Sequence, residues 1–155
     1  MLRSTFAFKP GDSLEGFMQR VYTIYDRPDV HANQSLLLAQ SKCFINSNMD
    51  CSTCHNTHIK DRGNYPQYAQ HCQNCHSTTN HNFCKMADSS NISFLKNSCT
   101  RCHMPAQPSN AIVVQTSKNR TNIPCMVISH RIAVYPEESK KIIAYLKNNG
   151  IEKKN

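Results

Sequence analysis

Cys51-Ser-Thr-Cys54-His55 is followed along the chain by Cys72-Gln-Asn-Cys75-His76 and then by Cys99-Thr-Arg-Cys102-His103. In each segment two cysteines stand three positions apart, and a histidine directly follows the second. A chain of 155 residues with 9 cysteines and 8 histidines would contain roughly 0.03 such segments by chance. The three segments therefore indicate a shared chemical requirement.

The C-x-x-C-H pattern is the signature of covalent haem c attachment. Two thiols at this spacing form thioethers to the two vinyl groups of one haem, and the adjoining imidazole binds the iron. The sequence therefore predicts three covalent haems c. The expected attachment residues are Cys51, Cys54, Cys72, Cys75, Cys99 and Cys102, and the expected proximal iron ligands are His55, His76 and His103.

A structural zinc site is the main alternative for the first two motifs. Cys54 and Cys72 are separated by 17 residues, so the two cysteine pairs have a spacing found in zinc sites. The histidine after each second cysteine, and the third motif with the same histidine, favour haem.

Five further histidines decide whether each iron is saturated, because a six-coordinate iron passes electrons whereas an open one binds small molecules. His58, three residues after a proximal histidine, is an expected distal ligand, and His81 and His130 are the other two. His31 is a further candidate in the first turn of a predicted helix. His71 is next to Cys72 and is more simply explained as bordering the edge of its own haem.

The remaining sulfur-containing residues near the motifs have simpler interpretations. Met104 adjoins a proximal histidine and is expected to pack. Met126 is expected in the core, with axial ligation of an iron as the alternative. Cys43, Cys84 and Cys125 lie outside the motifs, and two of them would be able to form a disulfide in an oxidising compartment. Cys84 with Cys125 is the favoured pair, although spacing does not fix the connectivity.

The composition predicts a thin protein-only core. Hydrophobic residues make up 39% of the chain and Trp is absent. Three large apolar haems would explain how such a chain folds compactly. We expect a mainly α fold with a large irregular fraction, forming one trihaem domain over residues 1–155.

The net charge of +8 comes from 18 Lys and Arg against 10 Asp and Glu. The positive residues are scattered and form no run of five, which argues against nucleic-acid binding. A moderately basic surface fits docking onto an acidic redox partner.

The expected elements fall into three regions. Residues 1–45 should be a helical lead-in, residues 46–135 a haem-binding region of loops and short helical turns, and residues 136–155 a C-terminal helix. The expected elements of the lead-in are an extended segment over 1–11, a helix over 14–25 capped by Asp12 or Ser13, and a helix over about 30–44 capped by Asp29. Those of the haem-binding region are turns at 51–56, 72–77 and 99–104, a short helix over 89–97, and brief strands or extended segments at 111–114 and 132–135.

Haem c attachment implies export, because c-type haem is attached outside the bacterial cytoplasmic membrane. We therefore expect a periplasmic or extracellular protein. Residues 1–10 show no apolar leader, and residues 36–39 are too short an apolar run to span a bilayer. The expectation is that a leader has been removed or that the chain is a downstream part of a longer multihaem protein.

Two motifs carry a resemblance to a known family over roughly residues 40–135. Cys51-Ser-Thr-Cys54-His55-Asn56-Thr57-His58 resembles the C-x-x-C-H-N-P-H of bacterial multihaem c-type cytochromes, in the group containing pentahaem nitrite reductase and octahaem hydroxylamine oxidase relatives. Cys99-Thr-Arg-Cys102-His103-Met104-Pro105 resembles their C-x-x-C-H-M-P.

The resemblance implies distal ligation by the histidines at the matching positions, which are His58, His81 and His130. Thr57 stands where the family has Pro, and Ser129 stands where it has Asp before the histidine.

Two functions follow as expectations. The first is an electron-transfer protein whose three haems, mostly bound by two histidines, relay electrons between redox partners or along a larger homo-oligomeric or multihaem assembly. The second is a haem enzyme or enzyme subunit in which one open-sided haem acts on a small nitrogen or sulfur compound. The lysine-ligated C-x-x-C-K variant of the nitrite reductase active site is absent from the sequence.

Overall fold

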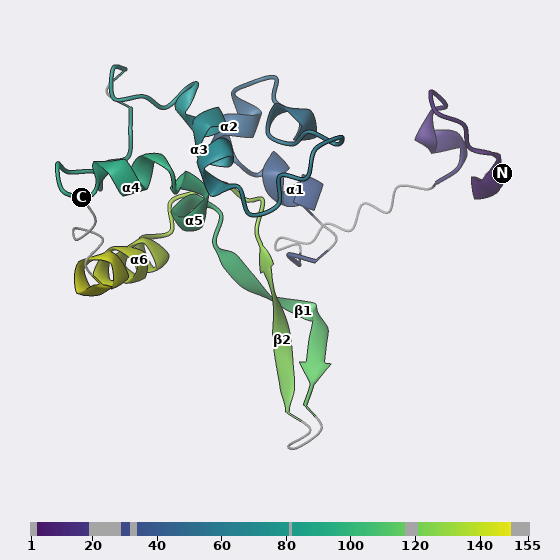
Figure 1. Ribbon diagram of the computed structural model, residues 1–155. Coiled ribbons are helices and arrows are strands. Elements are labelled where there is room, and N and C mark those ends of the chain that lie inside the picture. The colour runs from purple at the N-terminus through teal and green to yellow at the C-terminus, as the bar shows by residue number, and fades with distance from the viewer. Residues whose placement is uncertain (1–2, 19–28, 32–33, 81, 117–120, 150–155) are drawn as a thin grey trace.

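The computed structural model describes residues 3–18, 29–31, 34–80, 82–116 and 121–149 (Figure 1). Most of its elements are short helices joined by irregular segments. The α-helices are α1 (Gln34–Ala39), α2 (Lys42–Ile45), α3 (Tyr65–Gln73), α4 (Ile92–Lys96), α5 (Cys99–His103) and α6 (Pro136–Asn149). The 3-10 turns are η1 (Thr5–Ala7), η2 (Leu14–Gly16) and η3 (Cys51–Thr53), and the strands are β1 (Ala106–Gln115) and β2 (Asn122–Ile128).

The helices form a body around α3, which contacts α4 and α5. Helix α6 contacts α5, and α1 contacts α2. Among the described residues, none of the helices has the length and apolar character that a membrane crossing requires.

Residues 3–18 form a small separate segment, which Figure 1 shows apart from the helices. The Arg3 backbone N–H donates to the Gly16 carbonyl at 2.8 Å. The Phe17 ring meets the Phe8 ring edge-on at 5.4 Å, and the Arg3 guanidinium lies 4.5 Å from the Phe17 ring centre. The Phe17 ring therefore contacts both Phe8 and Arg3 and holds this segment together.

The two strands form an antiparallel hairpin that projects from the body as an arm (Figure 1). Ala106 pairs with Ile128 at the base of the arm, and Gln115 pairs with Asn122 near its tip; the register is irregular between Pro108 and Val113. Asp29 anchors the base, because its carboxylate accepts hydrogen bonds from the Ser109 hydroxyl at 2.8 Å and from the Asn110 backbone N–H.

The helix predicted over 30–44 is wrong, because the structure has two short helices, α1 and α2, with a break at Ser41. Ser41 has an extended backbone and is fully buried. Its hydroxyl accepts from the Ile132 N–H at 2.8 Å and donates to the His130 carbonyl at 3.4 Å. The break places the Ser41 hydroxyl where it can hydrogen-bond to the distant backbone at His130 and Ile132.

The N-terminal predictions are corrected in part. The segment expected to be extended contains η1, and the predicted helix starts only as η2, with Ser13 at its N-cap making no side-chain bond. Asp12 instead accepts from the Lys9 N–H at 3.0 Å within a turn. The continuation of that helix over 19–28 lies outside the described residues.

Residues 46–135 contain more regular structure than the sequence predicts. Helix α3 was not anticipated, nor was β2, and β1 is longer than the predicted segment at 111–114. The segment 132–135 is not a strand. The short helix within 89–97 is confirmed as α4, the C-terminal helix is confirmed as α6 up to Asn149, and all three motifs have helical turns.

The apolar core is small. Among the described residues the buried hydrophobic side chains are Phe17, Val30, Leu37, Ala69, Leu95 and Cys102, and the largest fully buried side chains are serines, namely Ser41, Ser109 and Ser129. The chain of 17.6 kDa has 12697 Å² of accessible surface, whereas a compact monomer of this mass would have about 8,000 Å². Protein packing alone therefore leaves much of the chain uncovered.

Candidate haem-attachment sites

The first motif lies on η3 and is held by a reciprocal cap. Asp50 accepts from the Thr53 N–H at 3.0 Å, and the Thr53 hydroxyl accepts from the Asp50 N–H at 3.0 Å. Hydrogen bonds from Ser52 and Thr53 lower the pKa of the Asp50 carboxyl. The His55 N–H donates to the Cys51 carbonyl at 3.0 Å, so both cysteines and the histidine belong to one turn.

The second motif continues from the C-terminal end of α3. The His76 N–H donates to the Cys72 carbonyl at 2.9 Å, which repeats the bond of the first motif. Asn82 fixes the turn, because its side chain accepts from the Ser77 N–H and donates to the Cys75 carbonyl, each at 2.9 Å. The Asn82 carbonyl lies 3.3 Å from Nδ1 of His76.

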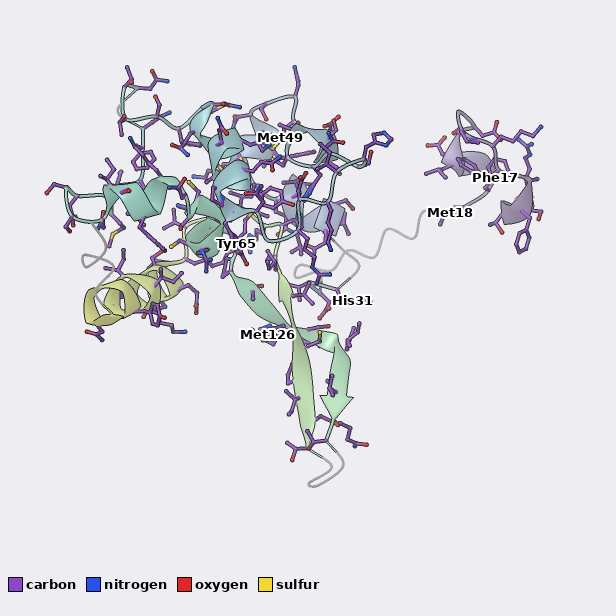
Figure 2. The ribbon with its side chains drawn as sticks, viewed as in Figure 1. Phe17, Met18, His31, Met49, Tyr65 and Met126 are labelled. Carbon is purple, nitrogen blue, oxygen red and sulfur yellow. The ribbon has the colours of Figure 1, made fainter. Side chains whose placement is uncertain are left out.

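The third motif is α5 itself. The Arg101 guanidinium lies 4.1 Å from the centre of the Tyr65 ring, a cation–π contact that fastens α5 to α3; Figure 2 shows Tyr65 within the helical body. Nδ1 of His103 lies 2.8 Å from the Ala133 carbonyl, and the Ala133 N–H returns a bond of 3.2 Å to the His103 carbonyl. The third motif is therefore tied to the segment that precedes α6.

Three candidate iron ligands share one arrangement. Nδ1 of His76, His103 and His130 each lies beside an oxygen that only accepts, and for His130 this is the Gln34 amide oxygen at 2.8 Å. The Gln34 amide nitrogen donates to the Ile128 carbonyl at 3.2 Å, which fixes the orientation of the amide. Each Nδ1 must therefore carry the proton, and Nε2 keeps the lone pair that a metal needs.

His55 and His130 are brought together although they are far apart in the sequence. Their ring centres are 6.0 Å apart with 34° between the planes. Two imidazoles on opposite sides of one metal ion, with bonds of about 2.0 Å, have ring centres about 6 Å apart. Burial, and then the neighbouring His55, lower the pKa of the His130 ring, so His130 is neutral at pH 7, as a ligand must be.

The other predicted ligands are placed differently. His58 is exposed, and its backbone N–H donates to the Asn56 side chain at 2.9 Å. His31 is exposed beside the hairpin (Figure 2), where its N–H donates to Asp29 at 2.8 Å. His71 is half-buried in the last turn of α3. His81 lies outside the described residues.

The two methionines differ in burial. Met104 is half-buried at the C-cap of α5, as a packing residue should be. Met126 is 59% exposed on β2, so the prediction that it lies in the core is wrong. The reason is that β2 belongs to an arm that no helix of the described chain covers (Figure 2).

The second and third motifs also meet through their thiols. A hydrogen bond from the Cys72 thiol lowers the pKa of Cys99 to about 7, and the same bond, together with burial, raises the pKa of Cys72. Burial and the nearby Cys43 raise the pKa of Cys54. The favoured Cys84–Cys125 disulfide does not form, since all nine cysteines are unpaired. Burial, and then the neighbouring Cys84, raise the pKa of the Cys102 thiol.

The side chains present fit haem c in their donor set. Each motif offers two thiols and an imidazole on one turn, and the Thr100 hydroxyl inside the third motif is buried without a hydrogen-bond partner. Among the residues that the structure describes, no three His, Cys, Asp or Glu side chains gather as a metal site.

Three positioning residues were not predicted from the sequence. Gln34 orients His130, Asn82 orients His76, and the Tyr68 ring meets His55 edge-on at 5.3 Å. Gln34 lies 96 positions before His130, so no local pattern links them. Asn82 lies only six positions after His76, and an amide so close to a motif was a usable signal for a turn.

A separate groove of about 630 Å³ lies between α3 and α4 and contains none of the candidate ligands. It is lined by Pro66, Gln67, Gln70, Gln73, Ser93, Lys96 and Asn97.

No known family model, curated protein or solved structure matches the chain.

Proposed function

We propose that this chain is an electron-transfer protein that carries three covalently attached haems c, mostly ligated by two histidines. The observation that carries the proposal is the approach of His130 to His55, with ring centres 6.0 Å apart. A second imidazole at this distance suits a saturated iron, and saturation blocks small-molecule binding.

The chain's own residues would hold and shield the cofactor. When bound, each haem supplies an iron that takes up and releases one electron. His55 and His130 would hold one iron, and the Gln34 amide oxygen keeps Nδ1 of His130 protonated. The Ala133 carbonyl does the same for His103. Fixed ligands change little between oxidation states, which favours fast transfer.

The small core supports the same proposal. The chain exposes far more surface than its mass predicts, and its most buried side chains are serines. Three large apolar cofactors would cover that surface. The resemblance of the first and third motifs to those of multihaem cytochromes points the same way. Haem c attachment would make this an exported protein, periplasmic or extracellular.

An acidic redox protein is the proposed exchange partner. The chain carries a net charge of +8, and complementary charge speeds the encounter of two proteins. The exchange would be sensitive to salt, since screening weakens this attraction.

The second candidate is an enzyme or enzyme subunit with one open-sided haem. It is favoured by the placement of His58, which is exposed at the surface. An iron without a second imidazole would have a free position for a small nitrogen or sulfur compound.

Two measurements test these proposals. The intact mass of the isolated chain under denaturing conditions should exceed the sequence mass by three haems, and an unmodified mass would refute haem attachment. Carbon monoxide added to the reduced protein should leave the spectrum unchanged if every iron is saturated. Stoichiometric binding at one haem would favour the enzyme.

The His130→Met variant tests the ligand pair. A thioether in place of an imidazole should raise the reduction potential of one haem, because Met/His ligation has the higher potential. His71→Ala is the matched control and should leave all potentials unchanged. Equal potentials in His130→Met and the wild type would remove His130 from the ligand set.

A further inference from the structure

The second and third motifs meet at one point between helices α3 and α5. The two helices contact each other within the body (Figure 1). Cys72 lies in the last turn of α3, and Cys99 is the first residue of α5. Their thiols are joined by a hydrogen bond. Each is the first cysteine of its motif, so one attachment point of the second motif lies against one attachment point of the third.

The backbone of each helix holds its own sulfur in place. The Cys72 sulfur lies 3.6 Å from the Tyr68 carbonyl oxygen, and the Cys99 sulfur lies 3.7 Å from the Leu95 carbonyl oxygen. Both thiols are half-buried. A cysteine sulfur moves by rotation about a single side-chain bond. The separation of the two sulfurs is therefore set by the packing of α5 on α3.

A second contact between these helices lies outside the thiols. The Arg101 guanidinium is 4.1 Å from the centre of the Tyr65 ring, at a distance typical of a cation–π interaction. Arg101 stands between Cys99 and Cys102 in the third motif and is not an attachment residue. It can therefore fix the distance between the two motifs without taking part in attachment.

We propose that the Cys72–Cys99 contact, held by Arg101 and Tyr65, makes the second and third haems the most closely coupled pair of the molecule. The inference rests on the proposed attachment of haem at these two motifs. A thioether joins the sulfur directly to the edge of its haem, so two touching sulfurs bring two haem edges together. Transfer across the contact moves one electron: one iron is oxidised as the other is reduced, and no bond is made or broken.

The first motif lies beside this pair on the α3 side. The Tyr68 ring of α3 meets His55 edge-on at 5.3 Å. The pKa of Cys72 is raised first by its hydrogen bond with Cys99, then by burial, and only more weakly by the charge of Cys54. The first motif therefore approaches the second motif without the direct sulfur contact that joins the second to the third.

Electron paramagnetic resonance of the full chain with its covalent haems tests the proposal, after the intact mass has shown three haems. In the fully oxidised wild type, two of the three ferric signals should be broadened by spin–spin interaction. Reducing one haem of the pair should sharpen the signal of the other. Replacing Cys51 and Cys54 by serine removes the first haem and should leave the broadened pair, whereas replacing Cys99 and Cys102 by serine should leave two narrow signals.

Two substitutions of one residue test the positioning contact. Tyr65→Leu removes the ring face beneath Arg101 and should narrow the two broadened signals. Tyr65→Phe keeps the ring and should retain the wild-type spectrum. Arg101→Gln should narrow the signals as Tyr65→Leu does, and its control is Arg62→Gln, which removes an exposed guanidinium before α3 and should leave the spectrum unchanged.

The outcomes separate this inference from the function on which it rests. A chain whose mass shows no haem overturns both. Three attached haems with three narrow signals in the wild type overturn the coupled pair alone, and this measurement needs no variant. A broadened pair that disappears when the first haem is removed also contradicts the proposal. Equal spectra of Tyr65→Leu and Tyr65→Phe would remove Tyr65 as a positioning residue.

Discussion

A histidine presents Nε2 to a metal only when Nδ1 carries the proton, and an oxygen acceptor beside Nδ1 enforces that state. His76 and His103 obtain this acceptor from backbone carbonyls, but His130 obtains it from the side chain of Gln34. Gln34 also accepts from the His130 backbone N–H at 3.0 Å. One amide therefore sets both the position and the tautomer of His130.

The Gln34→Leu variant tests this role. It keeps the approximate volume but leaves Nδ1–H of the half-buried His130 without an acceptor, a loss that costs about 1–3 kcal/mol. The free energy of unfolding, measured in urea, should fall by that amount. Gln40→Leu, at an exposed position after α1, should change it by less than about 0.5 kcal/mol. Equal effects of the two substitutions would contradict the proposed anchor.

At the scale of single residues, the motif cysteines and histidines could be predicted as haem ligands from the sequence because haem attachment would fix their spacing. Gln34 and Tyr68 were not predicted because glutamine and tyrosine occur in many contexts. The partner of Gln34, His130, is distant in the chain, and the partner of Tyr68, His55, lies in another segment of the fold. The third residue that was not predicted, Asn82, lies close enough to its motif for a local sequence pattern to have indicated it.

Among the elements, the break between α1 and α2 shows how tertiary structure overrides a local pattern. Residues 30–44 carry apolar side chains at helical spacing, so the sequence predicted one helix. The helix is interrupted at Ser41 because the Ser41 hydroxyl hydrogen-bonds to the backbone at His130 and Ile132. The break therefore belongs to the same network that positions His130.

Ser41→Ala should destabilise the chain. The substitution leaves the Ile132 N–H and the His130 carbonyl without their partner in a fully buried place, which costs about 1–3 kcal/mol. Urea unfolding measures the loss in the free energy of unfolding. The control is Ser35→Ala, at an exposed position on α1. If Ser41→Ala is no less stable than Ser35→Ala, the buried hydroxyl does not hold the segment.

The anchoring of the arm should depend on pH through Asp29. Hydrogen bonds, first from Asn110 and then from His31, lower the pKa of its carboxyl below 3.8. A carboxyl with a lowered pKa in the folded state contributes stability above its unfolded pKa and loses it as the pH falls through the folded value. Protection of the Asn110 amide against exchange, corrected for intrinsic rates, should therefore fall below pH 3.8. Asp29→Ala should show low protection at every pH; a wild type without this pH dependence would contradict the anchor.

For the whole molecule, prediction succeeded where local signals were strong. The acidic first turn of α6 and the motif turns were predicted, and the structure contains them. Helix α3 was missed because the sequence between the first two motifs is polar, and its pattern carries little information when few side chains enter a core. Strand β2 lies after the third motif, where Pro124 interrupts the apolar run. A chain in which few side chains enter a core has weak hydrophobic periodicity.

The cofactor should therefore decide whether the molecule folds compactly. A variant with all six attachment cysteines replaced by serine keeps every helix-forming signal but cannot attach haem. With so few buried apolar side chains, it should lack the surface burial that offsets conformational entropy. Small-angle scattering should give a radius of gyration well above the roughly 15 Å of a compact chain of this length, and urea unfolding should lose its cooperative transition. The haem-bearing chain should show a sharp transition under the same conditions. A serine variant that unfolds as cooperatively as the wild type would mean that the protein-only core suffices, and the thin core would then lend no support to haem as the organising element of this fold.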